Sequence, residues 1–502
     1  MGIAPKISPV NAARDFLINE LFFSTTTNKG IIVSGNDVFA RVSKYQIEEM
    51  IGKPHNLIRH PDMPRTVFKL LWDYLLAGKS IAAYVKNMAV DGRYYWVVAL
   101  VAPIEGGGYV SIRFKPSSQL FGIISDIYGE LRAIEQTHEE NGDGPKAGMH
   151  SAEAKFGEIL RAKGFADYDA FMQTLLYQEL NSRDDILARE HLSIFPPLPK
   201  PHAEEGALSA ALRRLYQDSQ QTYQQVTAVY TQLKEYMSRN DELGEHSRGI
   251  LALTGEFQLI CLNLTVASSR LANAGHTLTV VSAHLHEASA SVATIVSGLA
   301  TQASKISTCL GETVFGWAWA RLQSEVIIID YHECLTKLVS HDNQTNPTVY
   351  LKRLGDLRSA FSRTIERVEH SLHDLGKKLK GLTIEVEELR KALLSLQVTY
   401  VGGLVEASRL SEVGNFSTIF HDVHKHIAET KVKLAKFAQI ISRLDSLARL
   451  TPHITDIASC ARDQLRIDQE RLSVIANQTT AKPGPSLSEQ RKQPSQTQLV
   501  AG

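Results

Sequence analysis

Proline is spread unevenly along this chain of 502 residues, and its placement limits where long helices can form. Twelve of the 17 prolines lie at or before Pro201. The next are Pro347 and Pro452, and the others lie in the C-terminal tail. A proline inside a helix costs about 3 kcal/mol, because it lacks the backbone donor and clashes with the preceding turn. We therefore predict short elements before Pro201 and long helices after it.

The overall composition excludes several classes of protein. Basic and acidic residues number 54 each, so no net charge attracts nucleic acid or an acidic membrane. The longest apolar run begins at Trp96 and has about half of the ~20 residues that a membrane-spanning helix needs. The N-terminus lacks the pattern of a signal peptide. We predict a cytoplasmic protein without membrane insertion or nucleic-acid binding.

The cysteines indicate a reducing compartment. They are far apart in the sequence and form no CxxC pair, so neither a disulfide framework nor a thiolate zinc site is predicted. The four are Cys261, Cys309, Cys334 and Cys460.

The region 20–117 alternates short apolar runs with turn signals. Three runs are predicted to be strands, at Ile81–Met88, Tyr94–Pro103 and Tyr109–Lys115. Asp91-Gly92 between the first two is a hairpin signal. A small antiparallel sheet, with helices inserted after its early strands, is the predicted fold of this region.

Other segments flank this sheet. Residues 1–19 form an N-terminal segment, and residues 118–205 are predicted to be a mixed helical connector that ends in the rigid spacer FPPLPKP. Residues 478–502 are rich in Ser, Gln, Lys and Pro, a composition that cannot bury a core, and are predicted to be disordered.

A weak repeat lies in the proline-poor half. VASSRLANAG begins at Val266 and VEASRLSEVG begins 139 residues later, at Val405. Their final glycines, Gly275 and Gly414, each precede a new apolar pattern, as expected at a turn between helices. Chance similarity between two alanine- and serine-rich coiled coils is the alternative explanation.

The lengths of the segments between the turns favour a true repeat. Two tandem hairpins, 206–340 and 341–477, are predicted to pack as one elongated all-α, coiled-coil-like four-helix bundle. Their four arms are between about 63 and 69 residues long: Gly206–Ala274, His276–Val339, Thr348–Val413 and Asn415–Asn477.

The last arm carries the clearest heptad pattern. Its apolar positions alternate steps of four and three residues, which is the period of a coiled-coil seam. They are Phe416, Phe420, Val423, Ile427, Thr430, Leu434, Phe437, Ile441, Leu444 and Ala448.

The stretch PHNLIRHPDMPRTVF, beginning at Pro54, is stiff and polar. Its donors and charges are suited to lining a pocket for a polar, anionic ligand. The alternative is purely structural: the segment caps and orients a helix that begins near Pro64.

Several motifs of region 20–117 occur together in order: NDVFARVSKYQIEEMIGKPHNLIRHPDMP, YVKN, DGRYYWV and YVSIR. They resemble the PAS domain of bacterial aerotaxis receptors. The resemblance implies a five-stranded antiparallel sheet with helices over one face, enclosing a cavity that holds FAD. The family's flavin-pocket residues match Asn36, Arg59, His60, Asp62 and Asn87.

One position departs from that pattern. Ile81 stands where the best-known flavin-binding members have a tryptophan before the VKN strand. Haem, another ligand, or an empty PAS domain used for protein interaction therefore remain alternatives to FAD.

The two copies of the repeat resemble, in degenerate form, the hairpin tip of methyl-accepting chemotaxis receptors. The first keeps Asn263, Arg270 and Gly275, and the second keeps Glu406, Ala407, Arg409, Glu412 and Gly414. The resemblance implies the chemotaxis histidine kinase, its coupling protein or related receptors as partners. It also implies a receptor-like bundle, made by a homodimer or by one chain as a pseudo-dimer.

No catalytic constellation is found, so a non-enzymatic sensor and transducer in aerotaxis or chemotaxis is the predicted function. A PAS-containing scaffold or regulator without a redox cofactor is the alternative.

His421, His424 and His426 do not share one helical face, and we interpret them as solvated residues rather than a metal site. Trp317 and Trp319 are predicted to fill a packed layer.

Overall fold

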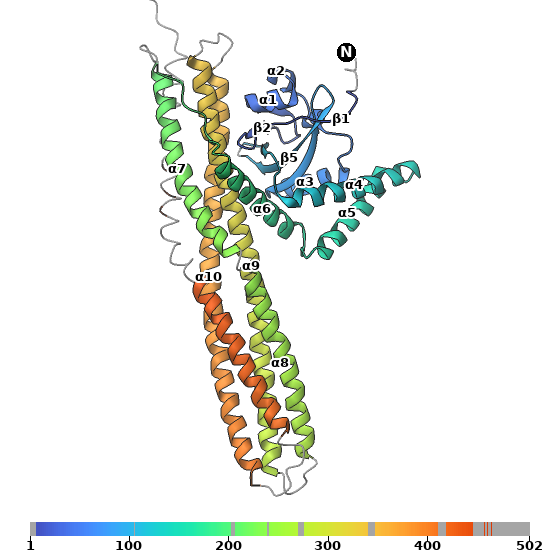
Figure 1. Ribbon diagram of the computed structural model, residues 1–502, viewed down its shortest axis with the longest axis vertical. Helices are drawn as coiled ribbons and strands as arrows, with labels where there is room; N and C mark the ends of the chain where they lie inside the picture. The colour runs from blue at the N-terminus through green and yellow to red at the C-terminus, as the bar shows by residue number, and fades with distance from the viewer. Residues whose placement is uncertain are drawn as a thin grey trace, which may run out of the picture.

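The computed structural model describes residues 7–104, 106–201, 206–237, 240–269, 276–339, 347–409 and 418–444, with three single residues beyond them. An N-terminal α+β domain lies against one half of a long helical bundle (Figure 1). The predicted fold class, an α+β domain followed by an all-α elongated region, is confirmed.

The sheet of the α+β domain has six strands; the pairing runs β1-β5-β6-β2-β3, and β4 also pairs with β5. All neighbours are antiparallel except β1, which pairs in parallel with β5. The strands are β1 Val10–Ala13, β2 Phe22–Thr26, β3 Ile32–Gly35, β4 Ile81–Met88, β5 Arg93–Pro103 and β6 Tyr109–Phe114. The last three match the predicted strands, whereas β1 lies in the N-terminal segment and was not predicted.

The predicted hairpin at Asp91-Gly92 joins β4 to β5. The amide of Ala89 donates to the carbonyl of Arg93, which closes the turn at 2.9 Å. Gly92 has a φ of +82°, and a Cβ there would lie 2.4 Å from the carbonyl oxygen of Ser8. Only glycine is tolerated at this position, because the backbone is left-handed and the N-terminal segment approaches closely.

Four short helical elements connect β3 to β4 and cover one face of the sheet. They are α1 Asp37–Ser43, α2 Ile47–Met50, the 3₁₀ helix η1 His55–Ile58 and α3 Arg65–Leu76. Helix α3 begins directly after its N-cap residue Pro64, as the structural interpretation of this segment predicted, and proline has no side-chain acceptor with which to cap the helix.

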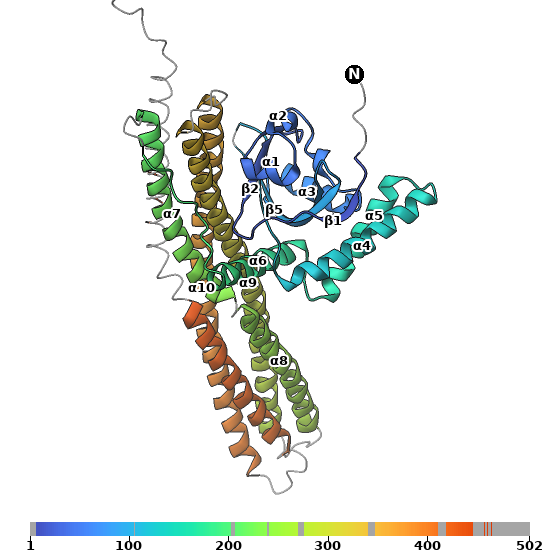
Figure 2. The ribbon, with the colours of Figure 1, turned by 45° about the horizontal axis from the view of Figure 1, so that its top comes forward.

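Three helices follow the sheet: α4 Gln119–Glu140, α5 Pro145–Ala162 and α6 Tyr168–Arg189. α4 and α5 form a hairpin that extends away from the bundle (Figure 2). Glu135 of α4 is buried and caps α3 from outside, because it accepts bonds from the amides of Arg65 and Thr66, each at 2.9 Å. Glu179 of α6 is also buried and accepts from the Ser117 amide at 2.7 Å. Buried carboxylates thus join the connector to the α+β domain.

The bundle consists of long antiparallel helices. They are α7 Ala207–Met237, α8 Asn240–Ser269, α9 His276–Val339, α10 Pro347–Ala407 and the helix of residues 418–444. α9 is the central helix and packs against α7, α8 and α10. The predicted turns at Gly275 and Gly414, the break at 340–346 and the tail 478–502 lie outside the described residues.

At the end of the bundle far from the sheet, one chain supplies four helices around a shared core. This distal core draws on α8, α9, α10 and the helix 418–444: Phe257, Cys261, Leu264, Leu278, Leu285, Leu396, Tyr400, Ala407, Phe420, Val423 and Ile427. The predicted heptad seam is confirmed from Phe420 to Leu444, where every seam position is buried. Phe416 and Ala448 lie outside the described residues.

Beside the sheet, α9 is enclosed by other helices. From Trp317 to Leu335 only Ile329 and His332 are not fully buried. A helix that is enclosed on all sides must be apolar or internally paired around its whole circumference. The prediction that Trp317 and Trp319 fill a packed layer is confirmed.

The region of α7 and α8, Ala207–Ser269, contains a helical window long and apolar enough to cross a membrane by length and composition alone. A third of its most apolar window, 33%, is buried inside the bundle. Core helices of soluble proteins pass the same test, so this is weak evidence for a membrane span.

Candidate functional site

A cavity of about 310 Å³ lies between the sheet and the helices that cover it. Its wall is formed by residues of η1, α3, β2, β4, β5 and β6, together with the loop before β3. This volume is at the lower end of the roughly 300–1,000 Å³ typical of small-molecule pockets. The domain therefore has room for a compact ligand.

The charge of the wall selects for anions. Lys29, Arg59 and Arg113 line the cavity, and none of its described lining residues is acidic. A ligand with negative charge or several acceptor oxygens would complement this wall.

Arg113 on β6 is the most unusual of these cations. It is buried, and its Nη2 donates to the Ser24 hydroxyl at 2.9 Å and lies 2.5 Å from Nε2 of His55. Its Nη1 has no hydrogen-bond partner among the described residues. Burial lowers the pKa of Arg113 to about 10, so it stays protonated at neutral pH. Burial, with the adjacent cation, also holds the pKa of His55 well below its ordinary value, so His55 is neutral and accepts the bond.

Two of the five predicted site residues line the cavity. Arg59 follows η1, donates from Nη2 to the carbonyl of Met63 at 2.8 Å and lies over the Phe68 ring at 4.2 Å. Burial lowers the pKa of Arg59. Asn87 on β4 forms a backbone bridge with Arg59, and its buried Nδ2 has no partner among the described residues. Two donors are thus available on neighbouring segments of the wall.

His60 and Asp62 are not among the lining residues. The His60 amide donates to the carbonyl of Lys86 at 3.3 Å, beside Asn87. The exposed Asp62 accepts from Lys86 at 2.7 Å and lies 3.4 Å from Nδ1 of His60. These contacts fasten the segment that carries Arg59 to the strand that carries Asn87.

Asn36 also lies outside the lining, at the N-cap of α1. Its buried Oδ1 accepts from the amides of Phe23 at 3.2 Å and Phe39 at 3.3 Å, and its Nδ2 donates to the carbonyl of Leu21. Asn36 therefore fixes α1 to β2.

Sequence reasoning missed Arg113, His55 and Trp72. Arg113 belongs to the YVSIR motif, which does not by itself show that this arginine lies in a wholly buried strand. Trp72 on α3 lines the cavity and meets the Tyr109 ring at 5.6 Å. Ile81 is buried in β4 but is not among the lining residues, so the aromatic part of this wall comes from α3 rather than from the start of β4.

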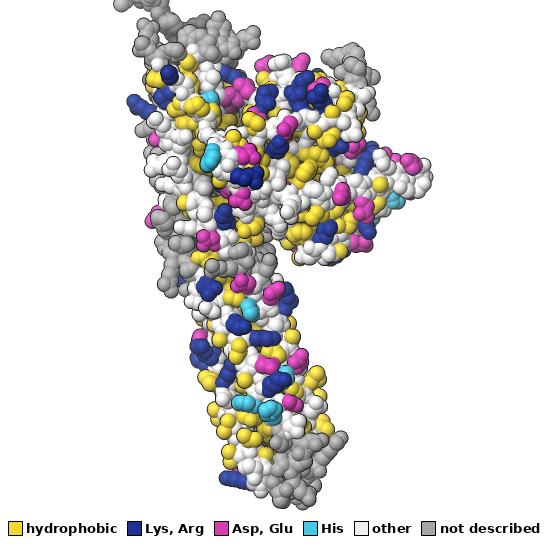
Figure 3. Space-filling view, in the orientation of Figure 1, with side chains coloured by type: hydrophobic (Ala, Val, Ile, Leu, Met, Phe, Trp, Pro, Cys, Tyr) yellow, Lys and Arg dark blue, Asp and Glu magenta, His cyan; other side chains and the backbone are white. Residues whose placement is uncertain are grey.

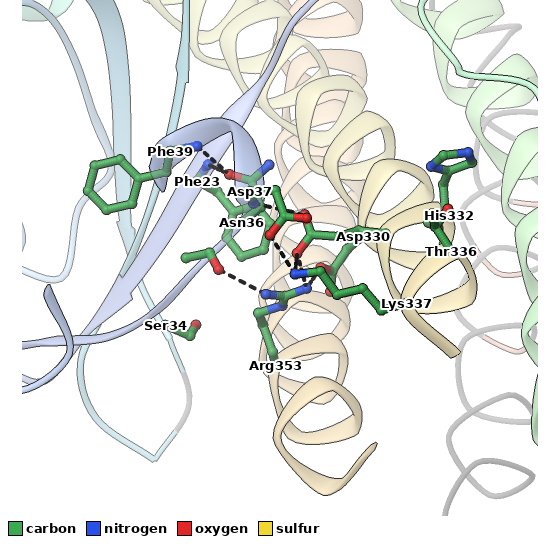
Figure 4. Close-up of polar contacts among 12 residues, drawn as sticks. Phe23, Ser34, Asn36, Asp37, Phe39, Asp330, His332, Thr336, Lys337 and Arg353 are labelled. Carbon is green, nitrogen blue, oxygen red and sulfur yellow. Dashed lines mark hydrogen bonds and ion pairs between the residues drawn. The ribbon is translucent and has the colours of Figure 1, made fainter. Parts of the chain in front are cut away.

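A cluster of charges joins the α+β domain to the bundle (Figure 4). We call it the junction cluster; it consists of Asp37, Asp330, Glu333, Lys337 and Arg353. Arg353 of α10 pairs with Asp330 and, at 3.1 Å, with Glu333 of α9. Lys337 pairs with Asp37 of α1 at 2.5 Å.

The domain also contacts the cluster through its backbone and a ring. Arg353 donates to the Gly35 carbonyl at 2.8 Å and lies over the Phe23 ring at 5.5 Å. The Asp37 amide, which no intrahelical carbonyl can satisfy at the first position of α1, donates to Glu333 at 2.9 Å. The start of α1 is thus completed by the bundle.

Aromatic contacts connect the cavity to this junction. The Arg113 guanidinium lies 5.1 Å from the centre of the Phe39 ring, and that ring stacks on His55 at 6.0 Å. Phe39 is in the first turn of α1, next to the Asp37 contact with the bundle. A change at Arg113 therefore has a short packed route to α9 and α10.

Among the described residues, no group of three or more His, Cys, Asp or Glu is arranged to hold a metal ion. His421 and His424 are exposed, and the His424 ring stacks on Tyr400 at 5.3 Å.

Comparison with known proteins identifies the N-terminal domain. The PAS fold family matches residues 32–112. The aerotaxis receptor of Escherichia coli (strain K12) is 39% identical over 114 residues, which is 22% of this chain and 22% of the receptor. The match thus spans about a fifth of the receptor. The predicted resemblance to an aerotaxis-receptor PAS domain is confirmed, and a mostly helical region follows that domain.

Two solved structures are also similar. The PAS domain of a protein from Colwellia psychrerythraea is 19% identical and covers 19% of this chain and 85% of its own, with a TM-score of 0.17. The LOV domain of the blue-light photoreceptor Aureochrome1 in its light state is 21% identical and covers 21% of this chain and 88% of its own, with a TM-score of 0.19.

Proposed function

We propose that the chain is a cytoplasmic, non-enzymatic sensor of redox state or oxygen, with FAD in its PAS cavity and a helical bundle as its output. The PAS domain and its similarity to the aerotaxis receptor support a sensor in aerotaxis signalling. The observation that carries the cofactor proposal is Arg113, a buried cation whose Nη1 has no partner among the described residues and which lines a cavity with no acid among its described lining residues.

The donor set suits a flavin. A bound flavin supplies reversible electron transfer, which changes the charge of its ring system. Arg59, Asn87 and Arg113 would hold acceptor atoms of the ring, and Trp72 would pack beside it. Because the cavity is small, the rest of the dinucleotide would extend beyond it. Haem is less well supported, because the Nε2 of the lining residue His55 is occupied by Arg113.

The remaining predicted site residues have positioning roles in this proposal. His60 and Asp62 hold the Arg59 segment against β4, and Asn36 holds α1 against β2. Their substitution would act on the cofactor indirectly, through the placement of Arg59, Asn87 and Phe39.

Two routes lead from the cavity to the bundle. One route is the connector that follows β6, whose first residues are fixed by Glu179. The shorter route is lateral, from Arg113 through Phe39 to α1 and the junction cluster. Electron transfer in the cavity would change the pull on Arg113, and α1 would pass that change to α9 and α10.

The output surface in this proposal is the distal end of the bundle. Large apolar side chains are exposed there on α8 and α10, including Leu259 at 63% and Val398 at 73%. Figure 3 shows hydrophobic side chains between the charged ones toward that end. The chemotaxis histidine kinase and its coupling protein would bind here, to a bundle that one chain supplies as a pseudo-dimer.

The test is the visible absorption spectrum of the purified full chain, before and after addition of FAD. Flavin bands support the proposal, and a folded protein that stays colourless and does not bind FAD favours the scaffold or regulator instead.

Arg113→Met is expected to weaken flavin binding about ten- to hundred-fold, because a charged hydrogen bond is worth about 1.5–3 kcal/mol. Arg189→Met, an exposed arginine at the end of α6, is the matched control.

The thermal stability of the flavin-free protein separates a ligand-binding role from a structural one. Arg113→Met is expected to leave the melting temperature unchanged or to raise it, since it removes an unpaired buried charge. A large loss of stability without FAD, with unchanged flavin affinity, would contradict the role proposed for Arg113.

Co-purification with the chemotaxis kinase and coupling protein tests the output surface, and Val398→Asp is expected to abolish it.

A further inference from the structure

The junction cluster is not electrically balanced. It contains three carboxylates, on Asp37, Asp330 and Glu333, and two cations, on Lys337 and Arg353. One negative charge is therefore in excess when every group is ionised. In a buried cluster such an excess is costly, because little water is present to solvate it.

The excess charge falls at Asp330. Its side chain is 0% exposed, whereas that of Asp37 is 57% exposed and can be solvated. Asp330 Oδ1 accepts from Arg353, but Oδ2 has no hydrogen-bond partner among the described residues. A proton on Oδ2 would break no observed contact of this carboxyl group.

The PAS domain is part of what keeps water from Asp330. Gly35 and Phe23 cover the guanidinium of Arg353. Asp37 fills the adjacent position against Glu333 and Lys337. Separation of α1 from the bundle would expose this side of the cluster to solvent and restore the ordinary acidity of Asp330.

The electrostatics point the same way. Burial, with the neighbouring Glu333, raises the pKa of Asp330 to about 7 against the pull of Arg353. The other titratable groups facing the cluster do not remove the excess charge near neutral pH. Burial raises the pKa values of Cys334 and Tyr350, so both stay neutral, while Lys337 and Arg353 stay charged because their pKa values are raised as well.

We propose that docking of α1 onto α9 and α10 takes up one proton, which goes from solvent to the Asp330 carboxylate, so that the PAS domain binds the bundle more tightly as pH falls. No electrons move, and no bond other than the new O–H is made. This inference goes beyond the proposed function, because it requires neither a flavin nor a chemotaxis partner. It makes the contact between sensor and bundle responsive to cytoplasmic pH.

The sign follows from linkage. A carboxyl group whose pKa is raised in the docked state favours docking while it is protonated, and this contribution is lost as pH rises through the docked-state value. Between the ordinary value near 4 and about 7, the docking constant changes by up to about tenfold per pH unit. Above this range Asp330 is ionised in both states, and the dependence ends.

Hydrogen–deuterium exchange of the full chain, followed by mass spectrometry of peptides from 32–43, measures docking directly. The Asp37 amide donates to the bundle, so its exchange reports the opening of the contact. Asp330→Asn imitates the protonated state. Comparison of the two proteins at the same pH, from pH 5 to 8.5, cancels the intrinsic pH dependence of amide exchange.

The wild-type protein is expected to open about tenfold more than Asp330→Asn at pH 5 and progressively more at higher pH, until the difference levels off above pH 7. Glu333→Gln removes one neighbouring negative charge and is expected to move the midpoint of this response to lower pH. Asp374→Asn, in an exposed pair on α10, is the control and should keep the wild-type response.

Three outcomes would overturn the proposal. They are a wild-type opening that does not depend on pH, a pH response that Asp330→Asn retains in full, and a midpoint that Glu333→Gln leaves in place. The last result counts even if Asp330→Asn fails to fold. Flavin occupancy, measured on the same samples, reports separately on the proposed function.

Discussion

Where α9 passes the PAS domain, α6, α7 and α10 enclose it, and its buried side chains include Arg321, Glu325 and Asp330. At its distal end the same helix buries one stripe, and Leu278 and Leu285 meet the apolar core shared with three other helices. The sequence of α9 thus changes from a repeating apolar seam to a set of individually paired positions.

The chemistry of the two regions differs accordingly. Near the PAS domain, Arg183 and Glu325 form a fully buried pair at 2.8 Å, and Arg321 binds both Asp184 and Glu325. In the long distal arms, ion pairs such as Asp374–Lys378 lie at the surface. A misplaced buried charge is severely penalised, so the proximal region has one permitted register. In the distal core, layers of similar apolar residues allow the helices to shift slightly against one another at a lower cost in free energy. A bundle that carries a signal needs such shifts.

Glu325→Gln should produce the largest loss of stability. It leaves Arg183 and Arg321 buried without their shared carboxylate, and such a change costs about 3–5 kcal/mol. Hydrogen exchange of peptides from α6 and α9 measures this as the free energy of local opening. Glu312→Gln, at an exposed position on the same helix, is the control. A loss below about 1 kcal/mol would show that the site of Arg183, Arg321 and Glu325 is hydrated and that the contrast between the regions is wrong.

A change in the distal seam should have a smaller and more local effect. Ile427→Val removes one methylene from the distal core and is expected to cost about 0.5–1.5 kcal/mol. Exchange should rise in α8, α10 and the helix 418–444, but not in the segment of α9 beside the PAS domain. An equal rise of exchange in the distal helices and in the segment of α9 beside the PAS domain would mean that the bundle opens as one unit. The two regions would then not differ in stability.

The smallest effect is expected at the surface pair. Asp374→Asn removes a carboxylate whose pKa is lowered by its hydrogen bond with Lys378. Exposed pairs of this spacing contribute about 0.3–0.5 kcal/mol, and salt screens them. Chemical denaturation at low and high salt should show a small difference that vanishes at high salt. A loss of stability above about 1 kcal/mol would mean that this surface pair contributes like the buried ion pairs near the PAS domain.

Local pattern was sufficient for part of this architecture. The short apolar runs at Ile81–Met88 and Tyr109–Lys115 predicted strands almost to the residue, and the heptads after Phe420 predicted a buried seam. Both depend on neighbours a few positions apart. The sequence did not predict that Arg353 meets Gly35, or that Glu325 meets Arg183, because these partners are more than 100 residues apart.

The cavity shows the same division. Arg59 and Asn87 were found through a motif, and both line it. Arg113 was missed because an arginine in an apolar strand is recognised as unusual only when its burial, and the absence of an acid beside it, are known. The docking of α1 was likewise missed, since Asp37 reads in sequence as an ordinary first-turn acid.

The capping of α3 by Glu135 has a practical consequence. A recombinant fragment ending at residue 117 would lack this carboxylate and would leave the amides of Arg65 and Thr66 unbonded. The same helix carries Phe68 and Trp72 into the cavity wall, so fraying at its start would deform the binding site. Affinities measured on such a fragment would underestimate those of the intact chain. Fragments for ligand screening should extend at least through α5.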